Sequence, residues 1–129
     1  MKWIIRLLEP GDHIRVNRGK YYHHGVYVGD NEVIHFTGED GDSTDKPELV
    51  EVRKTSIEFF AQKGIVEVAS PSLKEKFFVR HKNKRIRLAF ASLGKKGYNF
   101  FHNNCETFAN ECCYTRQLTS QTEEHQKKL

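Results

Sequence analysis

The stretch YYHHGVYVGDNEVIHF, residues 21–36, contains two β-rich runs on either side of a short polar segment. Tyr21–Val28 and Val33–Phe36 are rich in valine, isoleucine and aromatic residues, which favour strands. Between them, Gly29–Glu32 supplies the glycine, aspartate and asparagine typical of tight turns. The stretch therefore predicts a β-hairpin, around which the rest of the fold can be placed.

Shorter segments before and after the hairpin also have the pattern of strands. His13–Val16 alternates polar and apolar residues, as a half-buried strand does. Leu49–Arg53 and Ile65–Val68 predict two more strands. Thr37–Pro47 consists almost entirely of Gly, Asp, Glu, Ser, Thr and Lys, so we expect it to form an exposed loop.

Three helices are expected after residue 54. The sequence Thr55–Glu58 resembles a capping box at the start of a short helix. Apolar residues at helical spacing predict a second helix between Asn83 as its cap and Gly94 as its end. The third runs from Asn104 to about Tyr114. The fold class is therefore α+β, with an antiparallel β-sheet packed against helices.

Length and composition predict a single domain over residues 1–114 and a polar C-terminal tail over 115–129 that frays. The chain has 129 residues and a net charge of +4, but its 21 basic residues are mixed with 17 acidic ones. No nucleic-acid motif accompanies this charge, so no nucleic-acid partner is expected. The densest basic run, 81–85, is a solvated segment and a candidate for contact with lipid headgroups.

Localisation is expected to be cytoplasmic. The N-terminal apolar residues are interrupted by Arg6, Glu9 and Pro10 before a signal-peptide core forms, and no stretch has the roughly 20 apolar residues of a membrane span. The three cysteines lie close together near the end of the chain, which favours a reducing compartment.

The motif Asn103–Phe108 places Cys105 next to an expected helix start. A helix dipole lowers the pKa of a thiol too little to make it a thiolate at neutral pH. A nucleophilic Cys105 therefore requires a neighbouring histidine. A buried, inert thiol is the alternative, because free cysteine is among the most buried residue types.

The hairpin offers three histidines as that neighbour, and its register decides among them. A loop of odd length would set His23 directly opposite His35. A two-residue turn at Asp30–Asn31 would instead set His35 opposite Val26, on the face of His24. The residues themselves leave both registers open.

A zinc site made from these histidines and Cys105 lacks paired Cys-x-x-Cys or His-x-x-x-His spacing. No metal and no cofactor is therefore expected. Cys112 and Cys113 follow one to two helical turns later, where packing explains them without a catalytic role.

Together these motifs resemble the lecithin:retinol acyltransferase-like (LRAT domain) family, part of the wider NlpC-like superfamily of circularly permuted papain-like proteins. Leu8–Ile14 resembles the opening of the family, His23–Asp30 and Val33–His35 resemble its histidine block, and Asn103–Ala109 resembles its asparagine–cysteine block. The blocks occur in the family's order over most of residues 8–113.

The resemblance implies a Cys-His-His triad, with Cys105 as nucleophile at a helix N-terminus, His23 as general base and acid, and His35 as its orienting partner. It also implies that Tyr21 and Asn104 contact the substrate or its oxyanion. The backbone N–H of Cys105 is expected to act as a further oxyanion donor.

Alignment through residues 27–30 selects His23 over His24 as the catalytic histidine. His24 stands where the family usually has an aromatic residue. Thr107 stands where the family usually has histidine, a departure that bears on substrate choice.

The implied activity is that of a cysteine-dependent acyltransferase or a phospholipase A-like acyl hydrolase, acting through an acyl-thioester on Cys105. The partner is then an acyl-bearing substrate such as a phospholipid, and Phe100–Phe101 with the basic surface suggests transient contact with membranes. Two alternatives use the same fold: a cysteine peptidase or amidase of the NlpC-like superfamily, and a non-catalytic interaction module.

Overall fold

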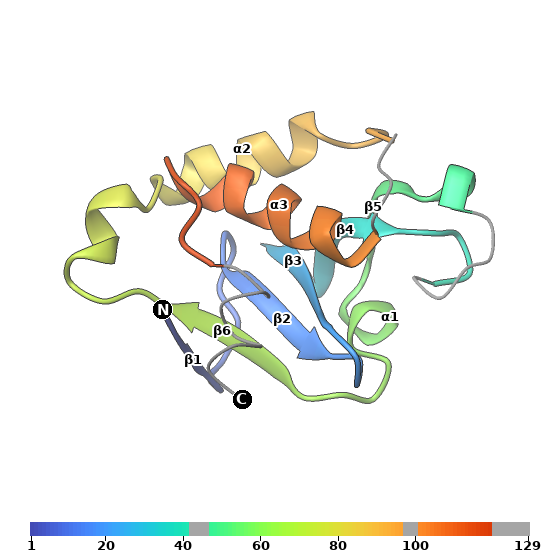
Figure 1. Cartoon of the computed structure of the whole chain (residues 1–129), viewed down its shortest axis with the longest axis horizontal. Helices are drawn as coiled ribbons and strands as arrows, with labels where there is room; N and C mark the ends of the chain where they lie inside the picture. Colours follow the sequence, from blue (N-terminus) through green and yellow to red (C-terminus); the bar gives the residue numbers. More distant parts are fainter. Residues whose placement is uncertain (42–46, 97–100, 120–129) are drawn as a thin grey trace.

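Six strands form one antiparallel sheet in the order β1-β6-β2-β3-β4-β5 (Figure 1). This computed structural model describes residues 1–41, 47–96 and 101–119. The strands are β1 Lys2–Ile4, β2 His13–Asn17, β3 Tyr22–Gly29, β4 Glu32–Thr37, β5 Glu51–Ser56 and β6 Val66–Ser70. The α+β class with an antiparallel sheet, as expected from the sequence, is confirmed.

Helices cover both faces of the sheet. The helical segments are η1 Pro47–Leu49, α1 Ile57–Ala61, η2 Glu75–Phe78, α2 Lys82–Ala91 and α3 Phe101–Cys113. On one face, Val26 and Ile34 of the hairpin pack in a core with Ala89 of α2 and Phe108 of α3. On the other face, a second core is built around Phe60 of α1. Figure 1 shows α3 lying across the sheet in front of β3.

Two helix starts differ from the sequence-based expectation. The cap of α1 is Ser56, whose Oγ accepts a hydrogen bond from the Phe59 N–H at 3.1 Å, while Thr55 remains in β5. The cap of α2 is His81 rather than Asn83, because the His81 side chain accepts from the Asn83 N–H. In both cases a neighbouring polar side chain takes the capping position.

The first described residues of the tail are held against α3. The Asn110 Oδ1 accepts from the backbone N–H groups of Leu118 and Thr119, at 3.2 and 3.3 Å, and its Nδ2 donates to Thr119 Oγ1 at 2.9 Å. The expected fraying therefore does not apply to residues 115–119, whereas residues 120–129 lie outside the described part. None of the helices in the described ranges combines the length and apolar character needed to cross a bilayer.

The central hairpin has a register that neither sequence-based alternative anticipated. Its turn is the two-residue Asp30–Asn31 type, with φ of 52° and 60°, and Gly29 pairs with Glu32. A bulge between Tyr27 and Gly29 then shifts the pairing by one residue, so His35 lies opposite Gly25. This shift moves His35 to the face of His23.

Gly25 is required where the hairpin meets α1. A Cβ at this position would lie 2.8 Å from Val33 Cγ1, 2.9 Å from Phe60 Cε2 and 3.1 Å from His35 Cβ. We expect Gly25→Ala to lower the free energy of unfolding by about 1–3 kcal/mol through overpacking, as measured by urea denaturation.

Gly19→Ala is the matched control for this substitution. No atom lies within 4 Å of a Cβ there, and only its φ of +92° opposes alanine. A cost of about 1 kcal/mol is expected from the left-handed backbone alone. Equal stability of Gly25→Ala and the wild type would contradict the steric argument.

Candidate active site

His23 and His35 form a hydrogen-bonded pair on the α1 face of the sheet. The His23 Nε2 lies 2.8 Å from the His35 Nδ1, and the His35 Nε2 lies 2.7 Å from the Thr55 Oγ1. Both histidines are fully buried, and both rings contact Phe60 at centroid distances of 5.3 and 5.1 Å. The pair is diagonal across the hairpin, not directly opposite, which still allows ring contact.

One assignment of protons satisfies the hydrogen bonds that join His23, His35 and Thr55. The Thr55 hydroxyl donates to the Ser56 carbonyl at 3.1 Å, so its oxygen accepts from the His35 Nε2–H. The His35 Nδ1 then accepts from the His23 Nε2–H, which places the lone pair of neutral His23 on Nδ1. A ring held in this tautomer has the basic nitrogen that a proton-accepting catalyst needs.

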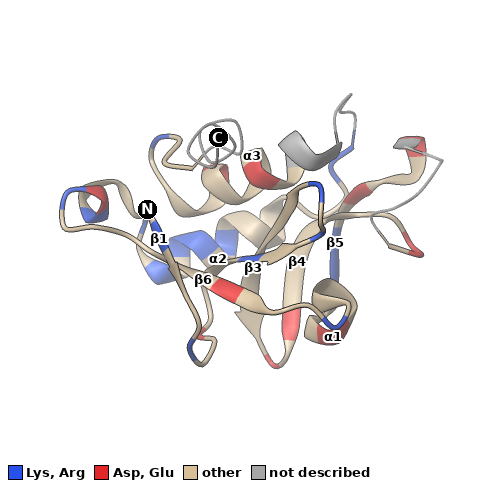
Figure 2. Cartoon of the chain, turned by 60° about the horizontal axis from the view of Figure 1, so that its bottom comes forward, with Lys and Arg blue, Asp and Glu red and all other residues tan. Residues whose placement is uncertain are grey.

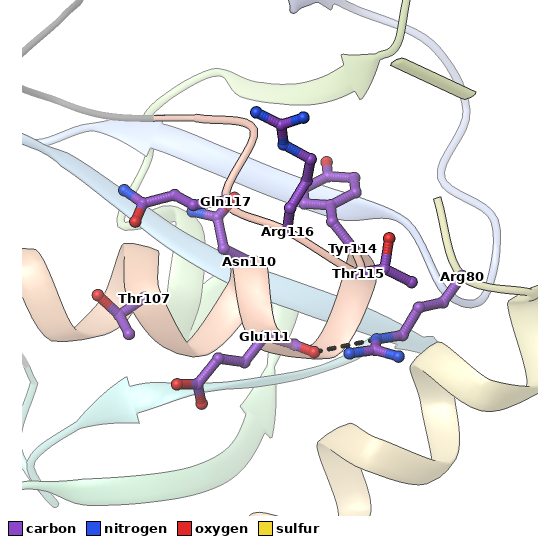
Figure 3. Close-up of a pocket in the computed structure, with 8 residues that line it drawn as sticks. All are labelled: Arg80, Thr107, Asn110, Glu111, Tyr114, Thr115, Arg116 and Gln117. Atoms are coloured by element: carbon purple, nitrogen blue, oxygen red, sulfur yellow. Dashed lines mark hydrogen bonds between the residues drawn. The ribbon is translucent and has the colours of Figure 1, made fainter. Parts of the chain in front are cut away.

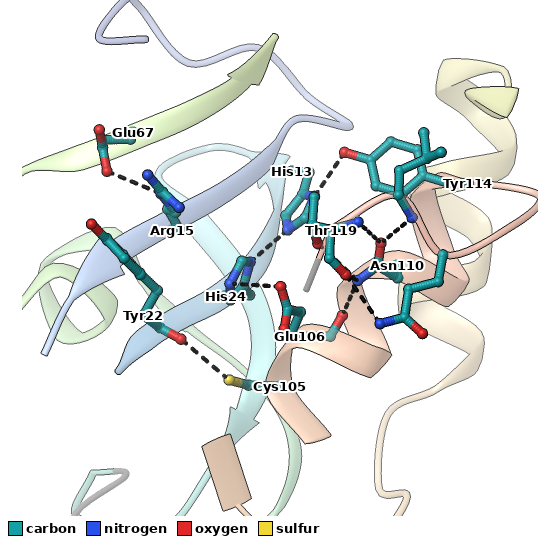
Figure 4. A network of polar contacts seen from close by, with 12 residues as sticks. His13, Arg15, Tyr22, His24, Glu67, Cys105, Glu106, Asn110, Tyr114 and Thr119 are labelled. Atoms are coloured by element: carbon teal, nitrogen blue, oxygen red, sulfur yellow. Dashed lines mark hydrogen bonds and ion pairs between the residues drawn. The ribbon is translucent and has the colours of Figure 1, made fainter. Parts of the chain in front are cut away.

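Cys105 is fully buried in α3 and lies beside the first residues of β3. Its Sγ is 3.8 Å from the Tyr22 carbonyl oxygen, one residue before His23 in the chain (Figure 4). Pairing between β3 and β4 stops at Gly25–His35, so residues 22–24 lie beyond that ladder. The thiol therefore approaches the strand where β4 does not accompany it.

The helix that carries Cys105 begins earlier than the sequence suggested. It starts at Phe101, not after an Asn104 cap, so Cys105 is its fifth residue. Nothing in the sequence from Phe101 to Asn103 interrupts a helix, since it lacks proline and glycine. The expected substrate role of the Asn104 side chain lies outside the described side chains.

Tyr21 lies directly before β3 with its ring edge-on to His23. The two ring centroids are 6.4 Å apart, and the planes are nearly perpendicular at 87°. The structure thus brings together three of the expected site residues, His23, His35 and Tyr21, while Cys105 lies against the adjoining Tyr22 carbonyl.

A second buried polar chain occupies the α3 face of the sheet (Figure 4). The Tyr114 hydroxyl lies 2.8 Å from the His13 Nδ1, and the His13 Nε2 lies 2.8 Å from the His24 Nδ1. The His24 Nε2 faces the Glu106 Oε2 at 3.6 Å. His24 is thus part of a different network from its neighbour His23, because adjacent strand residues point to opposite faces.

Burial keeps both histidines of this second chain neutral. Desolvation, aided by Arg15 and Arg85, lowers the pKa of His13 to about 3. Desolvation, followed by the charges of His13, His23 and Arg15, also lowers the pKa of His24 well below its usual value. Neutral rings with Tyr114 as the first donor give a chain of hydrogen bonds directed toward Glu106.

The sequence analysis missed His13, Glu106 and Tyr114 as members of a network. The signal was present in part, because His13 and His24 fall on two strands that were predicted one after the other in the chain. The contact between the two histidines depends on the strand register, which sets Arg15 opposite His24 and so makes His13 and His24 diagonal neighbours. The sequence did not reveal this register.

The other two cysteines are unreactive by environment. Burial raises the pKa of Cys112 to about 12, and burial together with the charge of Cys112 raises the pKa of Cys113 further. Both are free thiols in the core beneath α3. Their packing role agrees with the sequence-based interpretation.

The solvent side of α3 borders a pocket of about 230 Å³ (Figure 3). It runs along one stripe of the helix from Thr107 to Tyr114, and Arg80 and Arg116 also line it. Thr107, the position that departs from the family pattern, thus faces a pocket instead of the core around Cys105. Across the described ranges, no group of three or more His, Cys, Asp or Glu side chains is arranged to hold a metal ion.

A model of the family described as lecithin retinol acyltransferase matches residues 6–118, and the chain belongs to this family. This confirms the resemblance on which the expected site was based.

Curated relatives include lecithin retinol acyltransferase of Rattus norvegicus, 28% identical over 135 aligned positions, and that of Mus musculus, 27% identical over the same length. Each alignment covers 88% of this chain and 57% of the relative, so the chain spans little more than half the length of these relatives. Protein LEAD-SENSITIVE 1 of Arabidopsis thaliana is 62% identical over 32 residues, or 23% of this chain and 12% of the relative.

The neutral buried histidines predict a loss of stability in mild acid. Below about pH 6.5 the unfolded chain protonates His13 and His24, whereas the folded chain does not until the pH is far lower. Unfolding then takes up protons, so the free energy of unfolding falls as pH decreases from about 6.5, by about 1.4 kcal/mol per pH unit for each histidine.

His13→Gln tests this linkage. The variant should show a smaller slope of unfolding free energy against pH between pH 6 and 4, measured by urea titration at each pH. An unchanged slope would show that His13 is not held neutral in the folded protein.

Proposed function

We propose that this chain is a cysteine-dependent acyltransferase or acyl hydrolase that works through an acyl-thioester on Cys105. The observation that carries the proposal is the His23–His35 hydrogen bond, which holds His23 in one tautomer beside the segment that Cys105 contacts. Membership of the LRAT family supports acyl transfer as the reaction class.

In the proposed reaction, His23 takes the thiol proton and the Cys105 thiolate attacks the carbonyl carbon of an acyl ester. The tetrahedral intermediate collapses as His23 returns the proton to the leaving alcohol, leaving the acyl group on sulfur. Water or an acceptor hydroxyl or amine, deprotonated by His23, then attacks the thioester and releases Cys105. His35 orients His23 and stabilises its protonated form through the 2.8 Å contact.

His23 precedes Cys105 in this chain, whereas in papain-like enzymes the nucleophilic cysteine precedes the histidine. We therefore assign the domain to the circularly permuted papain-like group. Cys105 is in α3 and the histidines are on the hairpin, so the site assembles where helix and sheet meet. We further propose that Tyr21, whose ring is edge-on to His23, contacts the substrate carbonyl.

The acyl donor we propose is a phospholipid. The rat and mouse relatives are named for lecithin and for acyl transfer, and this name supports the same donor class for this chain. Whether water or another acceptor completes the cycle depends on water access to the thioester, which distinguishes a hydrolase from a transferase.

An acyl-enzyme adduct is the direct test. We expect incubation with a short-chain phosphatidylcholine or a p-nitrophenyl acyl ester to add one acyl mass to the wild type, seen by intact-protein mass spectrometry. Cys105→Ala should show no adduct. Cys112→Ala, which removes a buried thiol of raised pKa, should still be acylated. An adduct on Cys105→Ala would contradict the assignment, and turnover of peptides alone would favour an amidase.

The two adjacent histidines should differ sharply in their effect on catalysis. We expect His23→Gln to lower kcat for the p-nitrophenyl ester by about 10²–10⁴-fold, the usual contribution of a general acid–base. His24→Gln should lower kcat by less than about tenfold, because the two ring nitrogens of His24 face His13 and Glu106 and not the His23–His35 pair. Thermal unfolding of both variants checks their folding. The reverse order of effects would assign the base to His24.

A further inference from the structure

Two large apolar side chains project from the segment between β6 and α2. Leu73 is 84% exposed and Phe77 is 90% exposed. They are four residues apart, and Phe77 belongs to η2. Removing apolar surface of this kind from water is favourable by about 25 cal/mol per Å² of area buried. A surface that buries both side chains would therefore gain affinity.

Basic residues lie close to these two side chains in the sequence. Lys74 and Lys76 alternate with them along the segment, and exposed Lys82, Lys84 and Arg87 follow on α2. Figure 2 shows the basic residues on η2 and along α2. The acidic residue of the segment, Glu75, lies 3.0 Å from the Met1 amino group, which offsets its charge.

Hydrogen bonds within the segment and to the end of α3 define where the two apolar side chains lie. Ser72 and Glu75 cap each other: the Ser72 N–H donates to Glu75 Oε1 at 2.9 Å, and the Glu75 N–H donates to Ser72 Oγ at 3.2 Å. Two backbone bonds of 2.8 Å then tie it to the end of α3, from the Arg80 N–H to the Cys113 carbonyl and from the Thr115 N–H to the Phe78 carbonyl. A contact made by this surface therefore costs little ordering entropy.

We propose that the surface formed by residues 72–77 docks on an anionic lipid bilayer, with Leu73 and Phe77 inserted among the headgroups. Apolar tips that alternate with lysines match the two components of such an interface, acyl chains below and negative headgroups above. A second copy of the chain fits less well, because a symmetric dimer at this surface would bring Lys74 and Lys76 against the same cations.

This inference rests on the proposed function in one respect, since it names the bilayer as the source of the acyl lipid. The bonds of the docking segment to the end of α3 connect it to the helix of Cys105. The earlier suggestion of Phe100–Phe101 as the membrane contact falls outside the described side chains.

Vesicle co-sedimentation tests the docking surface. We use the full chain with Cys105→Ala, so that binding is measured without chemistry, and vesicles of phosphatidylcholine with or without phosphatidylserine at low salt. The Cys105→Ala protein should sediment with the phosphatidylserine vesicles. Adding Leu73→Ser and Phe77→Ser should weaken partitioning about tenfold or more. Adding Lys74→Glu and Lys76→Glu should weaken binding mainly to the anionic vesicles.

Ile65→Ser is the matched control, because Ile65 is 68% exposed and lies in the α1–β6 connection, away from η2 (Figure 1). It should bind as the parent protein does. Absence of vesicle binding by the parent, or equal binding by the Leu73→Ser/Phe77→Ser protein, would overturn the proposal. Concentration-dependent dimers that this double substitution abolishes, without vesicle binding, would overturn it in favour of a second copy. Esterase activity on a monomeric p-nitrophenyl ester is measured separately, because this reaction needs no bilayer. A protein that fails to bind vesicles but hydrolyses the ester would contradict the docking proposal and not the thioester chemistry.

Discussion

The site depends on a one-residue shift in the pairing of β3 with β4. Without the bulge between Tyr27 and Gly29, the Asp30–Asn31 turn would set His35 opposite Val26, on the α3 face. With it, His35 shares a face with His23, and their ring nitrogens come within 2.8 Å. The packing of Phe60 against both rings and the contact of His35 with Thr55 then fix the pair.

The same strand supports a second network because its residues alternate between two faces. His23 points to α1 and pairs with His35, while His24 points to α3 and pairs with His13. The second network links β2 and β3 to the middle of α3 through Glu106, the residue after Cys105, and to Tyr114, which follows the end of α3. The position of α3, and with it of Cys105 beside β3, thus depends on polar contacts as well as on the apolar core.

Much of the fold followed from local sequence pattern, and the exceptions have physical causes. The hairpin and β2 were found because β-branched and aromatic residues alternate there, and Asp30–Asn31 has turn chemistry. The only sequence signal of the bulge is Gly29, whose φ is +96°, and a glycine at this place is equally typical of the turn, so the register of His35 was not predicted. The start of α3 was misplaced because Asn104 is a good cap that the structure does not use. The pairing of His23 with His35 was expected from the family resemblance, whereas residues alone left His24 open.

The two edges of the sheet bear on how the molecule meets other chains. The edge strand β1 has only three residues and carries Lys2, and the opposite edge strand β5 carries Arg53 and Lys54. A short edge and charged edges both discourage a foreign strand from adding to the ladder. Intermolecular β-pairing, the common route from a mixed fold to aggregates, is therefore discouraged at both ends of this sheet.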